Sequence, residues 1–315
     1  MDYRHDLLIR ISELYYYENM NQQEIAKIHH LSRPTVSRIL DEAKQLGIVE
    51  IKVHSPVEKN NELANAVRKR FNLKEIVVVK GDFDFKKGLQ MASKAAALFL
   101  PAILENNQIV GTSWGRALRL LAQEVIPGQH YNINFTQMVG CLGTGNPLYD
   151  GFEISHDLSK KFNGTYTNIY APLYVDSKLV YSYLVAEPQI QNALNRVKKA
   201  DVTISGIGSL VDNESTIQQA GYYSEKDRLN LLSKNAVGHV LGRMYDINGN
   251  EIAVPNRYII SAELSDFKNA NWSIGISAGK KNAESVMGTL NGGFFNMYFM
   301  DEALAIALLN FDKTQ

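Results

Sequence analysis

Cysteine, net charge and long apolar runs are what this 315-residue sequence lacks. Its single cysteine, Cys141, excludes an internal disulfide framework and fits a reducing compartment. Lysine plus arginine and aspartate plus glutamate number 33 each, so the chain has no general attraction to polyanions. No signal peptide opens the sequence and no apolar run could cross a bilayer, so we expect a cytoplasmic protein without a membrane partner.

The sequence does contain a short amino-terminal segment that predicts two helices joined by a tight turn, residues 21 to 46. Asn21 can cap the first helix, and Glu24 three residues later completes a capping box. Ser32 can cap the second helix, in which Pro34 falls in the first turn and costs little. The spacing therefore predicts a helix-turn-helix.

The second helix has two distinct sides. Apolar residues recur at helical spacing at Val36, Ile39, Leu40, Ala43 and Leu46. The opposite side carries polar residues near the end that a recognition helix inserts into the major groove, where arginine can pair with guanine. The candidate DNA-reading residues are Gln22, Gln23, Ser32, Arg33, Pro34, Thr35, Ser37 and Arg38.

The surroundings bear on this prediction in two ways. Residues 7–19 form a plausible supporting helix, and residues 47–54 alternate like the strand of a small wing. Acidic residues offset the basic ones in residues 1–56, so the head lacks a strongly basic signature, and joining two or more heads would have to supply affinity. The plain alternative is an amphipathic helix pair with a solvated outer face; the helix-turn-helix pattern favours DNA binding.

The remainder of the chain alternates between short β-rich runs and helical segments. Residues 54–62 are polar, contain Pro56 and suit a linker. Strands are expected at residues 75–79, 108–113, 133–140, 166–174, 201–208, 258–263, 272–279 and 295–300, with helices such as 89–105 and 283–293 between them. This alternation predicts an α/β, Rossmann-like domain with a mostly parallel sheet covered by helices on both faces.

Four glycine-rich turns follow predicted strands, at residues 111–116, 140–146, 205–209 and 278–282. A glycine at a strand end usually marks only a tight turn. In parallel sheets, however, ligands bind at the carboxyl ends of strands, where such turns expose backbone N–H groups. Four turns at one edge therefore predict a small-molecule pocket.

Two enzyme classes compete with a binding function. The turn from Gly111 to Gly115 fits the nucleophile-elbow pattern with Ser113, but a serine hydrolase also needs a later catalytic histidine, and His239 lies in a segment that reads as packed secondary structure. A sugar-phosphate isomerase could use Asp246 with Lys280 or Lys281, although Asp246 more simply starts a turn. We expect no catalytic residue, metal or cofactor.

The sequence resembles the SorC family of bacterial sugar-operon regulators across nearly its whole length. The segments that carry the resemblance are residues 14–26, 32–51, 110–118, 206–209, 236–250 and 291–309. The resemblance implies an operator-binding head over residues 1–55. It also implies a sugar- or phosphosugar-binding and oligomerisation domain over residues 56–315, similar to sugar-phosphate isomerases but inactive. Members are usually tetramers that repress or activate transcription.

The resemblance also implies an effector site. Its candidate residues are Gly111, Thr112, Ser113, Trp114, Gly115, Arg116, Gly140, Cys141, Gly143, Gly206, Gly208, Asp246, Gly279, Lys280 and Asn282. One departure matters: many members have a Gly-Gly pair followed by a phosphate-binding lysine, and here Ala278, Gly279 and Asn282 occupy those places. Both a phosphosugar and an unphosphorylated sugar or polyol therefore remain candidate effectors.

Overall fold

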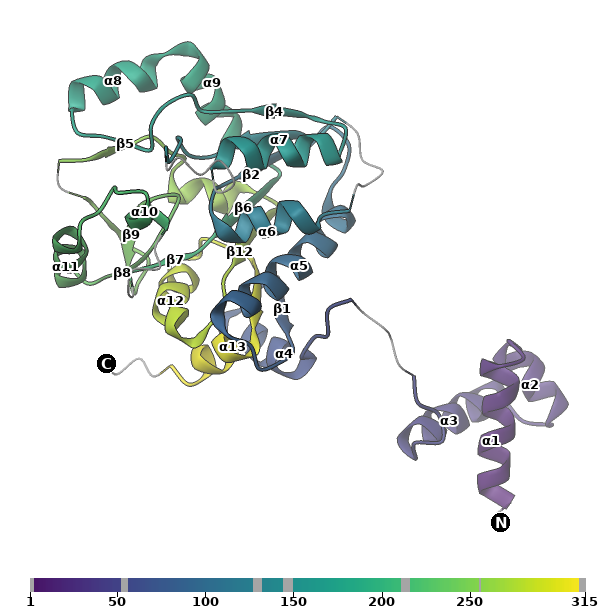
Figure 1. Ribbon diagram of the computed structural model, residues 1–315. Helices are drawn as coiled ribbons and strands as arrows, with labels where there is room; N and C mark the ends of the chain where they lie inside the picture. The colour runs from purple at the N-terminus through teal and green to yellow at the C-terminus, as the bar shows by residue number, and fades with distance from the viewer. Residues whose placement is uncertain are drawn as a thin grey trace. The chain divides into compact units, whose positions relative to one another are not determined.

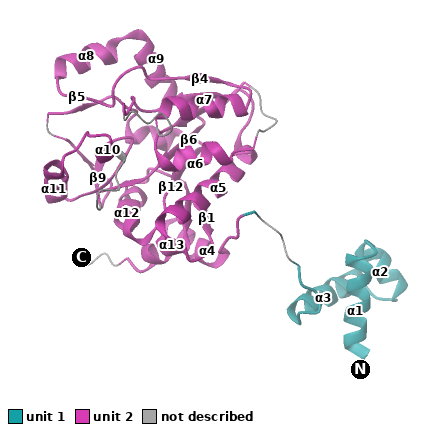
Figure 2. Cartoon of the chain, viewed as in Figure 1, with its two compact units in different colours: residues 1–56 teal, residues 57–315 magenta. Residues whose placement is uncertain are grey.

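The computed structural model describes residues 3–51, 56–126, 132–143, 150–210, 216–254 and 256–311. The chain divides into two compact units, Met1–Pro56 and Val57–Gln315, each with its own core (Figure 2). None of the helices within these described ranges combines the length and the apolar character that crossing a bilayer requires.

The described part of unit 1 is a bundle of three helices, α1 (Tyr3–Tyr16), α2 (Gln22–Ile28) and α3 (Arg33–Gln45). Its core consists of Leu8, Ile11, Leu14, Ile25, Ala26, Val36, Ile39, Leu40 and Ala43. The predicted supporting helix is therefore present as α1, and the predicted apolar stripe of α3 is buried except at its last member. Leu46 is 61% exposed because it lies beyond the final turn of α3.

The predicted helix starts are confirmed. Asn21 Oδ1 accepts the N–H groups of Gln23 and Glu24, both at 3.0 Å, and Glu24 Oε2 accepts the Asn21 N–H at 2.9 Å. Ser32 Oγ accepts the Thr35 N–H at 3.3 Å at the start of α3. Each contact satisfies an N–H group that a helix cannot bond internally.

The predicted wing strand is wrong for the residues that can be described. Residues 47–51 form a turn and irregular backbone, and residues 52–54 lie outside the described ranges. The N–H groups of Ile48 and Val49 both donate to the Ala43 carbonyl, at 2.9 and 3.2 Å, while Gly47 has a φ of 71°. These amides therefore close the end of α3 instead of pairing with a second strand.

Within its described residues, unit 2 is built on a seven-stranded sheet in which all pairings are parallel (Figure 1). In spatial order the strands are β1 (Glu75–Val79), β13 (Met297–Asp301), β12 (Trp272–Ile276), β6 (Val202–Gly206), β2 (Ile109–Thr112), β3 (Asn134–Gln137) and β4 (Thr165–Thr167). The predicted parallel sheet is confirmed.

Helices cover both faces of this sheet. On one face, α5 (Phe85–Ile103), α6 (Arg116–Glu124) and α7 (Gly151–Lys161) share an apolar core with the strands (Figure 1). On the other, α4 (Asn61–Phe71), α9 (Pro188–Val197), α12 (Ala283–Gly292) and α13 (Glu302–Leu309) contribute to a second core. The remaining helices among the described residues of unit 2 are α8 (Lys178–Ala186), α10 (Thr216–Gln219), α11 (Glu225–Ser233) and the 3-10 turns η3 (Leu264–Asn269) and η4 (Lys280–Asn282).

Two smaller antiparallel sheets were not anticipated. One contains β10 (Glu251–Ile252), β9 (Arg243–Asp246), β8 (Ala236–Val240) and β7 (Gly208–Ser209), and the other pairs β11 (Tyr258–Ile259) with β5 (Tyr174–Val175). The strand predicted at 258–263 is thus shorter and belongs to the β5 pair instead of the parallel sheet. A short apolar run shows that a strand forms but does not show which strand it will pair with.

The direction in which the chain winds reverses between β2 and β6, which are neighbours. From β2 the chain continues to β3 and β4, whereas from β6 it continues to β12 and β13 on the opposite side. The turns that leave the carboxyl ends of β2 and β6 therefore diverge and open a crevice. This is where doubly wound sheets bind ligands.

Candidate functional site

The outer side of α3 presents two cationic side chains. Arg33 and Arg38 are both exposed. Among the described residues neither guanidinium has an acidic partner, because the ion pairs of the head involve Arg4, Arg10 and Lys44. The side chains of Arg33 and Arg38 are thus available to phosphate or base edges, as DNA recognition requires.

The other predicted DNA-reading residues also lie at the helix starts. Gln22 and Gln23 open α2, and Ser32 directly precedes α3. Ser32 Oγ and Thr35 Oγ1 are 2.8 Å apart. These residues gather at the amino-terminal turns of α2 and α3, which are the parts of a helix-turn-helix that approach the duplex.

Unit 2 contains a cavity of about 480 Å³ at the carboxyl edge of its parallel sheet. Its walls come from the segments that follow β1, β2, β6 and β12, together with the turn between β8 and β9. This volume lies in the range that small-molecule sites occupy. The cavity includes the crevice between β2 and β6.

Three of the four predicted glycine-rich turns meet at this cavity. The predicted residues that line it are Ser113, Trp114, Gly115, Arg116, Gly206, Gly208, Gly279, Lys280 and Asn282. Ser205, Ser209 and Lys281 from the same turns line it as well.

Other predicted residues lie elsewhere. Gly111 and Thr112 are within β2, where Thr112 Oγ1 is 2.8 Å from Ser155 Oγ. Gly140 and Cys141 donate their N–H groups to Ile260 and Ala171, both carbonyls of neighbouring segments. These two and Gly143 follow β3, which is one strand further from the β2–β6 crevice, and they are outside the cavity lining. Residues 144–146 of the same predicted turn lie outside the described ranges.

Asp246 is a turn residue and does not line the cavity. Its Oδ1 accepts the N–H groups of Asn248 and Asn250 at 2.9 and 2.8 Å, and its Oδ2 accepts the Asn250 side-chain amide at 3.0 Å. The Asp246 carboxylate thus closes its own turn. Of the two roles that the sequence allowed, a turn residue and an acid–base residue, the structure shows the first.

Several cavity residues are not among the predicted effector-site residues. They include Asp82, Phe83, Phe85, Leu89, His239, Leu241, Ile276 and Ala303. Phe83 and Phe85 follow β1, which pairs with the distant β13, and His239 and Leu241 belong to the unanticipated antiparallel sheet. Only the long-range pairing brings these segments to the pocket, so no local pattern could have identified them.

The charged side chains among the described residues that line the cavity are mainly basic. They are Arg116, Lys280 and Lys281, with Asp82 as the single acid of this set. The Arg116 guanidinium lies 5.2 Å from the centre of the Phe85 ring, a cation–π geometry that orients it. Helix α6 begins at Arg116 after Gly115, which has a φ of 99° and provides no side-chain cap. Its first N–H groups add to a site suited to an anion.

His239 adds a neutral polar group to the same cavity. Burial lowers its pKa from 6.5 to about 4, so the imidazole is uncharged at neutral pH and has one donor and one acceptor nitrogen. Its ring centre is 6.1 Å from that of Trp114. A Cβ at position 208 would overlap the His239 ring, which explains why glycine is needed there.

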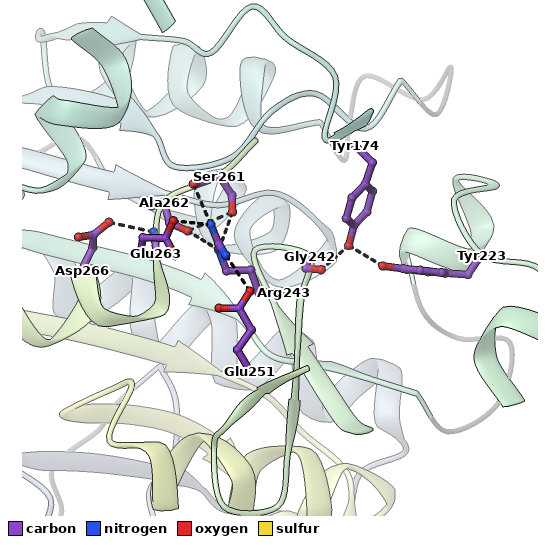
Figure 3. A network of polar contacts seen from close by, with 9 residues as sticks. All are labelled: Tyr174, Tyr223, Gly242, Arg243, Glu251, Ser261, Ala262, Glu263 and Asp266. Atoms are coloured by element: carbon purple, nitrogen blue, oxygen red, sulfur yellow. Dashed lines mark hydrogen bonds and ion pairs between the residues drawn. The ribbon is translucent and has the colours of Figure 1, made fainter. Parts of the chain in front are cut away.

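Leu241 lies in the cavity lining, and the next residue, Gly242, is held by a hydrogen bond from Tyr174 (Figure 3). Leu241 and Gly242 have φ values of 54° and 81°, and the first is a strained conformation for leucine. The Gly242 carbonyl accepts the Tyr174 hydroxyl, whose oxygen is 2.5 Å from that of Tyr223. These contacts compensate for the strain and fix the turn.

Arg243, the next residue, anchors the turn to the rest of unit 2 (Figure 3). It is 8% exposed and pairs with Glu251 at 2.7 Å and Glu263 at 2.8 Å. Its Nε also donates to the Ala262 carbonyl at 2.8 Å. A buried charge with this many partners is satisfied by the protein itself. Arg243 is outside the cavity lining and supports the cavity wall.

Comparison with known protein families agrees with the division into two units. Residues 55–310 match the family model described as "Putative sugar-binding domain". Residues 11–45, which include the two helices α2 and α3, match the model of sigma-70, region 4.

Curated relatives are similar over nearly the whole chain. The deoxyribonucleoside regulator of Bacillus subtilis is 28% identical over 98% of this chain and 98% of its own length. The sorbitol operon regulator of Klebsiella pneumoniae is 27% identical over 96% of this chain and 97% of its own length. Both are named as regulators and neither as an enzyme.

Solved structures share the fold. The full-length sorbitol operon regulator SorC from Klebsiella pneumoniae superimposes with a TM-score of 0.76 at 26% identity, covering 98% of this chain and all of that one. A probable sor operon regulator from Shigella flexneri gives a TM-score of 0.74 at 24% identity and covers 80% of this chain and 99% of that one.

Proposed function

The chain belongs to the SorC-like family of sugar-binding operon regulators, and from this premise we propose that it regulates transcription of a carbohydrate-utilisation operon in response to a small sugar derivative. In this proposal unit 1 binds operator DNA and unit 2 binds the effector. The observation that carries it is one chain that joins two structures. They are a helix-turn-helix whose Arg33 and Arg38 have no acidic partner in the described ranges, and a cavity whose described charged residues are mainly basic.

Arg33 and Arg38 are the residues we assign to operator contact. They project from the start of α3 without acidic partners in the described part of the chain, and Thr35 and Ser37 lie beside them. Each bidentate arginine–guanine pair discriminates by about 1–3 kcal/mol. Because the head has no excess of basic residues, we propose that a homo-oligomer, a tetramer in the cytoplasm, joins several heads on one operator.

A sugar phosphate is the effector class that the cavity favours. Arg116, the first N–H groups of α6 and the lysines at 280 and 281 offer positive partners to an anionic group. Neutral groups, namely His239 and the hydroxyls of Ser205, Ser209 and Ser277, suit sugar hydroxyls. Lys280 and Lys281 would thus serve the role that family members give to a lysine at the place of Asn282.

Operator binding is tested by comparing Arg38→Ala with Arg10→Ala in an anisotropy assay on the duplex upstream of the gene. Arg10 lies on α1, where it pairs with Glu13 and Glu18, and serves as the control. We expect Arg38→Ala to weaken binding by about 5–150-fold, the equivalent of about 1–3 kcal/mol. Wild-type affinity should also fall as salt is raised, because counterions are released on binding.

Effector binding is tested by a thermal-shift screen of 2-deoxyribose 5-phosphate, sorbitol 6-phosphate and their unphosphorylated forms. A ligand at 100 times its Kd stabilises the native state by about 2.7 kcal/mol and raises its melting temperature. We expect a phosphorylated probe to act, and Arg116→Ala to abolish the shift while the exposed control Lys199→Ala retains it. A response confined to the unphosphorylated probes would reject the sugar-phosphate assignment.

A further inference from the structure

The first residues of unit 2 lie along the edge of the parallel sheet. Val57 is buried in the core, Asn60 N donates to the Val78 carbonyl at 2.8 Å, and Lys80 N donates to the Glu58 carbonyl at 2.9 Å. Lys59 and Val79 form an antiparallel bridge. The sequence predicted a linker over 54–62, but residues 57–60 are bonded to β1, the edge strand next to β13. The chain therefore leaves unit 2 toward the head from a fixed position.

The segment that follows β1 forms part of the cavity. Asp82, Phe83 and Phe85 line it. Gly81 has a φ of 141°, and a side chain there would overlap the Phe83 ring, so the backbone conformation depends on glycine. The residues from which the chain leaves toward the head therefore lie next to the cavity segment, because Glu58 is bonded to Lys80, which is close in sequence to Asp82.

One carboxylate bonds to both of these segments. Glu302 Oε2 accepts the Gly81 N–H at 2.9 Å, and Glu302 Oε1 accepts the Asn60 side-chain amide. The Asn60 Oδ1 at the same time caps α4 through the Leu63 N–H, at 3.0 Å. The Asn60 and Gly81 hydrogen bonds hold the pKa of Glu302 below its usual value, so the carboxylate is charged and accepts both bonds at neutral pH.

The residues on either side of Glu302 also reach the cavity. Asp301 accepts the N–H of Gly279, a cavity residue, at 3.0 and 3.1 Å, and Ala303 itself lines the cavity. These three residues lie where β13 ends and α13 begins. Helix α13 lies beside α4 and β1 (Figure 1). Two cavity loops and the exit toward the head are thus attached to one short stretch of backbone.

We propose that Glu302 is the positioning residue that couples occupancy of the cavity to the DNA-binding head. This inference rests on the proposed function. A ligand that contacts residues 81–85 and moves them toward the cavity alters the hydrogen bond between the Gly81 N–H and Glu302. Glu302 also bonds to Asn60, so the change reaches the residues from which the chain leaves toward the head. Coupling arises because the ligand and the operator favour different states of this connection.

The test measures operator affinity of the full-length protein with and without the sugar phosphate that stabilises it in the thermal-shift screen, 2-deoxyribose 5-phosphate or sorbitol 6-phosphate. The variant is Glu302→Gln. Gly81 and Asn60 donate to different oxygens of Glu302, and glutamine replaces one of these oxygens with an NH2 donor, so one of the two bonds is lost. Glu62→Gln, an exposed glutamate in the first turn of α4, is the matched control for loss of charge nearby.

A second variant breaks the same connection from the other side. Asn60→Ser keeps an N-cap for α4 but loses the amide that reaches Glu302. For both variants we expect probe binding and operator binding, each measured alone, to stay within about twofold of wild type. The ratio of operator affinities with and without probe should fall from the wild-type value, typically about 5–150-fold for allosteric sites, to within about twofold of one.

The outcomes separate the inference from the function on which it rests. The role of Glu302 would be overturned if the probe changed operator affinity as much in Glu302→Gln and Asn60→Ser as it does in wild type and in the control Glu62→Gln. Loss of probe binding itself in either variant would also overturn it, since Glu302 would then shape the pocket instead of transmitting its state. A wild-type protein whose operator affinity ignores both sugar phosphates would reject the proposed function, and this inference with it.

Discussion

The two units differ in how far along the chain their contacts reach. In unit 1 the core joins three consecutive helices, and each helix of the turn motif is capped by a residue beside it. In unit 2 the edge strand β1 pairs with β13, so that Glu75 lies opposite Met297. A unit with a small core and mostly local contacts has little stability to spare, whereas one with a core on each sheet face has more.

The largest expected effect comes from truncating one isoleucine in each unit. Ile25 and Ile204 are both fully buried, and replacing either with alanine should cost about 2–5 kcal/mol. A domain of about 50 residues has a total stability of only about 3–8 kcal/mol at typical values per residue. Ile25→Ala should therefore unfold much of the head and abolish operator binding, while Ile204→Ala leaves unit 2 folded but less stable.

The two tryptophans make this comparison measurable, because Trp114 and Trp272 both belong to unit 2. The urea midpoint followed by their fluorescence should be unchanged in Ile25→Ala and lowered in Ile204→Ala. A shift of the tryptophan midpoint in Ile25→Ala would mean that the two units unfold together, and the distinction between them would fail.

The same difference in contact range explains what the sequence could reveal. The caps at Asn21 and Ser32 and the spacing of Val36, Ile39 and Leu40 depend on residues within a few positions of one another, so the head could be predicted almost residue by residue. The predicted wing strand was wrong because the alternation of apolar and polar residues over 47–51 does not show that the Ile48 and Val49 N–H groups donate to the Ala43 carbonyl.

In unit 2 the strands of the parallel sheet were predictable and their partners only partly so, whereas most strands of the two antiparallel sheets were not predicted. Buried parallel strands such as 75–79 read as continuous apolar runs, and three glycine turns met as expected. Phe85 and His239 reach the cavity only through the pairing of β1 with β13 and of β8 with β7, which join distant segments. The described residues of the turn after β3, Gly140 to Gly143, are outside the cavity lining because the strand order, which the sequence does not specify, puts β3 one strand away from the crevice.

A smaller effect, confined to unit 2, should follow from His239. Its pKa in the folded protein is about 4, below the ordinary 6.5. Between pH 6.5 and pH 4 the unfolded chain therefore binds a proton at this histidine and the folded chain does not. Stability should therefore fall as the pH drops from about 6.5 toward 4, by at most about 3 kcal/mol from this group. We expect this loss of stability in unit 2 and not in the head, because His239 is buried in unit 2.

The measurement is the urea midpoint from tryptophan fluorescence at pH 7 and pH 5, in wild type and in His239→Gln. Glutamine cannot titrate, so the fall in midpoint between the two pH values should be smaller in the variant. His156→Gln, on α7, is the control and should keep the wild-type fall. Equal falls in wild type and His239→Gln would show that this histidine is not held neutral by burial.

The smallest effect should come from capping boxes, and one can be compared in each unit. Asn21 caps α2 in the head and Ser224 caps α11 in unit 2, and the backbone N–H of each donates to the carboxylate three residues later. Replacing either with alanine should cost about 0.5–2 kcal/mol. In the head this loss is a substantial share of the total stability, so Asn21→Ala should weaken operator binding measurably near the temperature at which the head begins to unfold.

Ser224→Ala should lower the urea midpoint of tryptophan fluorescence slightly and leave operator binding intact. Asn21→Ser, which restores a capping oxygen, should recover most of the lost affinity; if it does not, Asn21 acts at the DNA surface and not through the stability of α2.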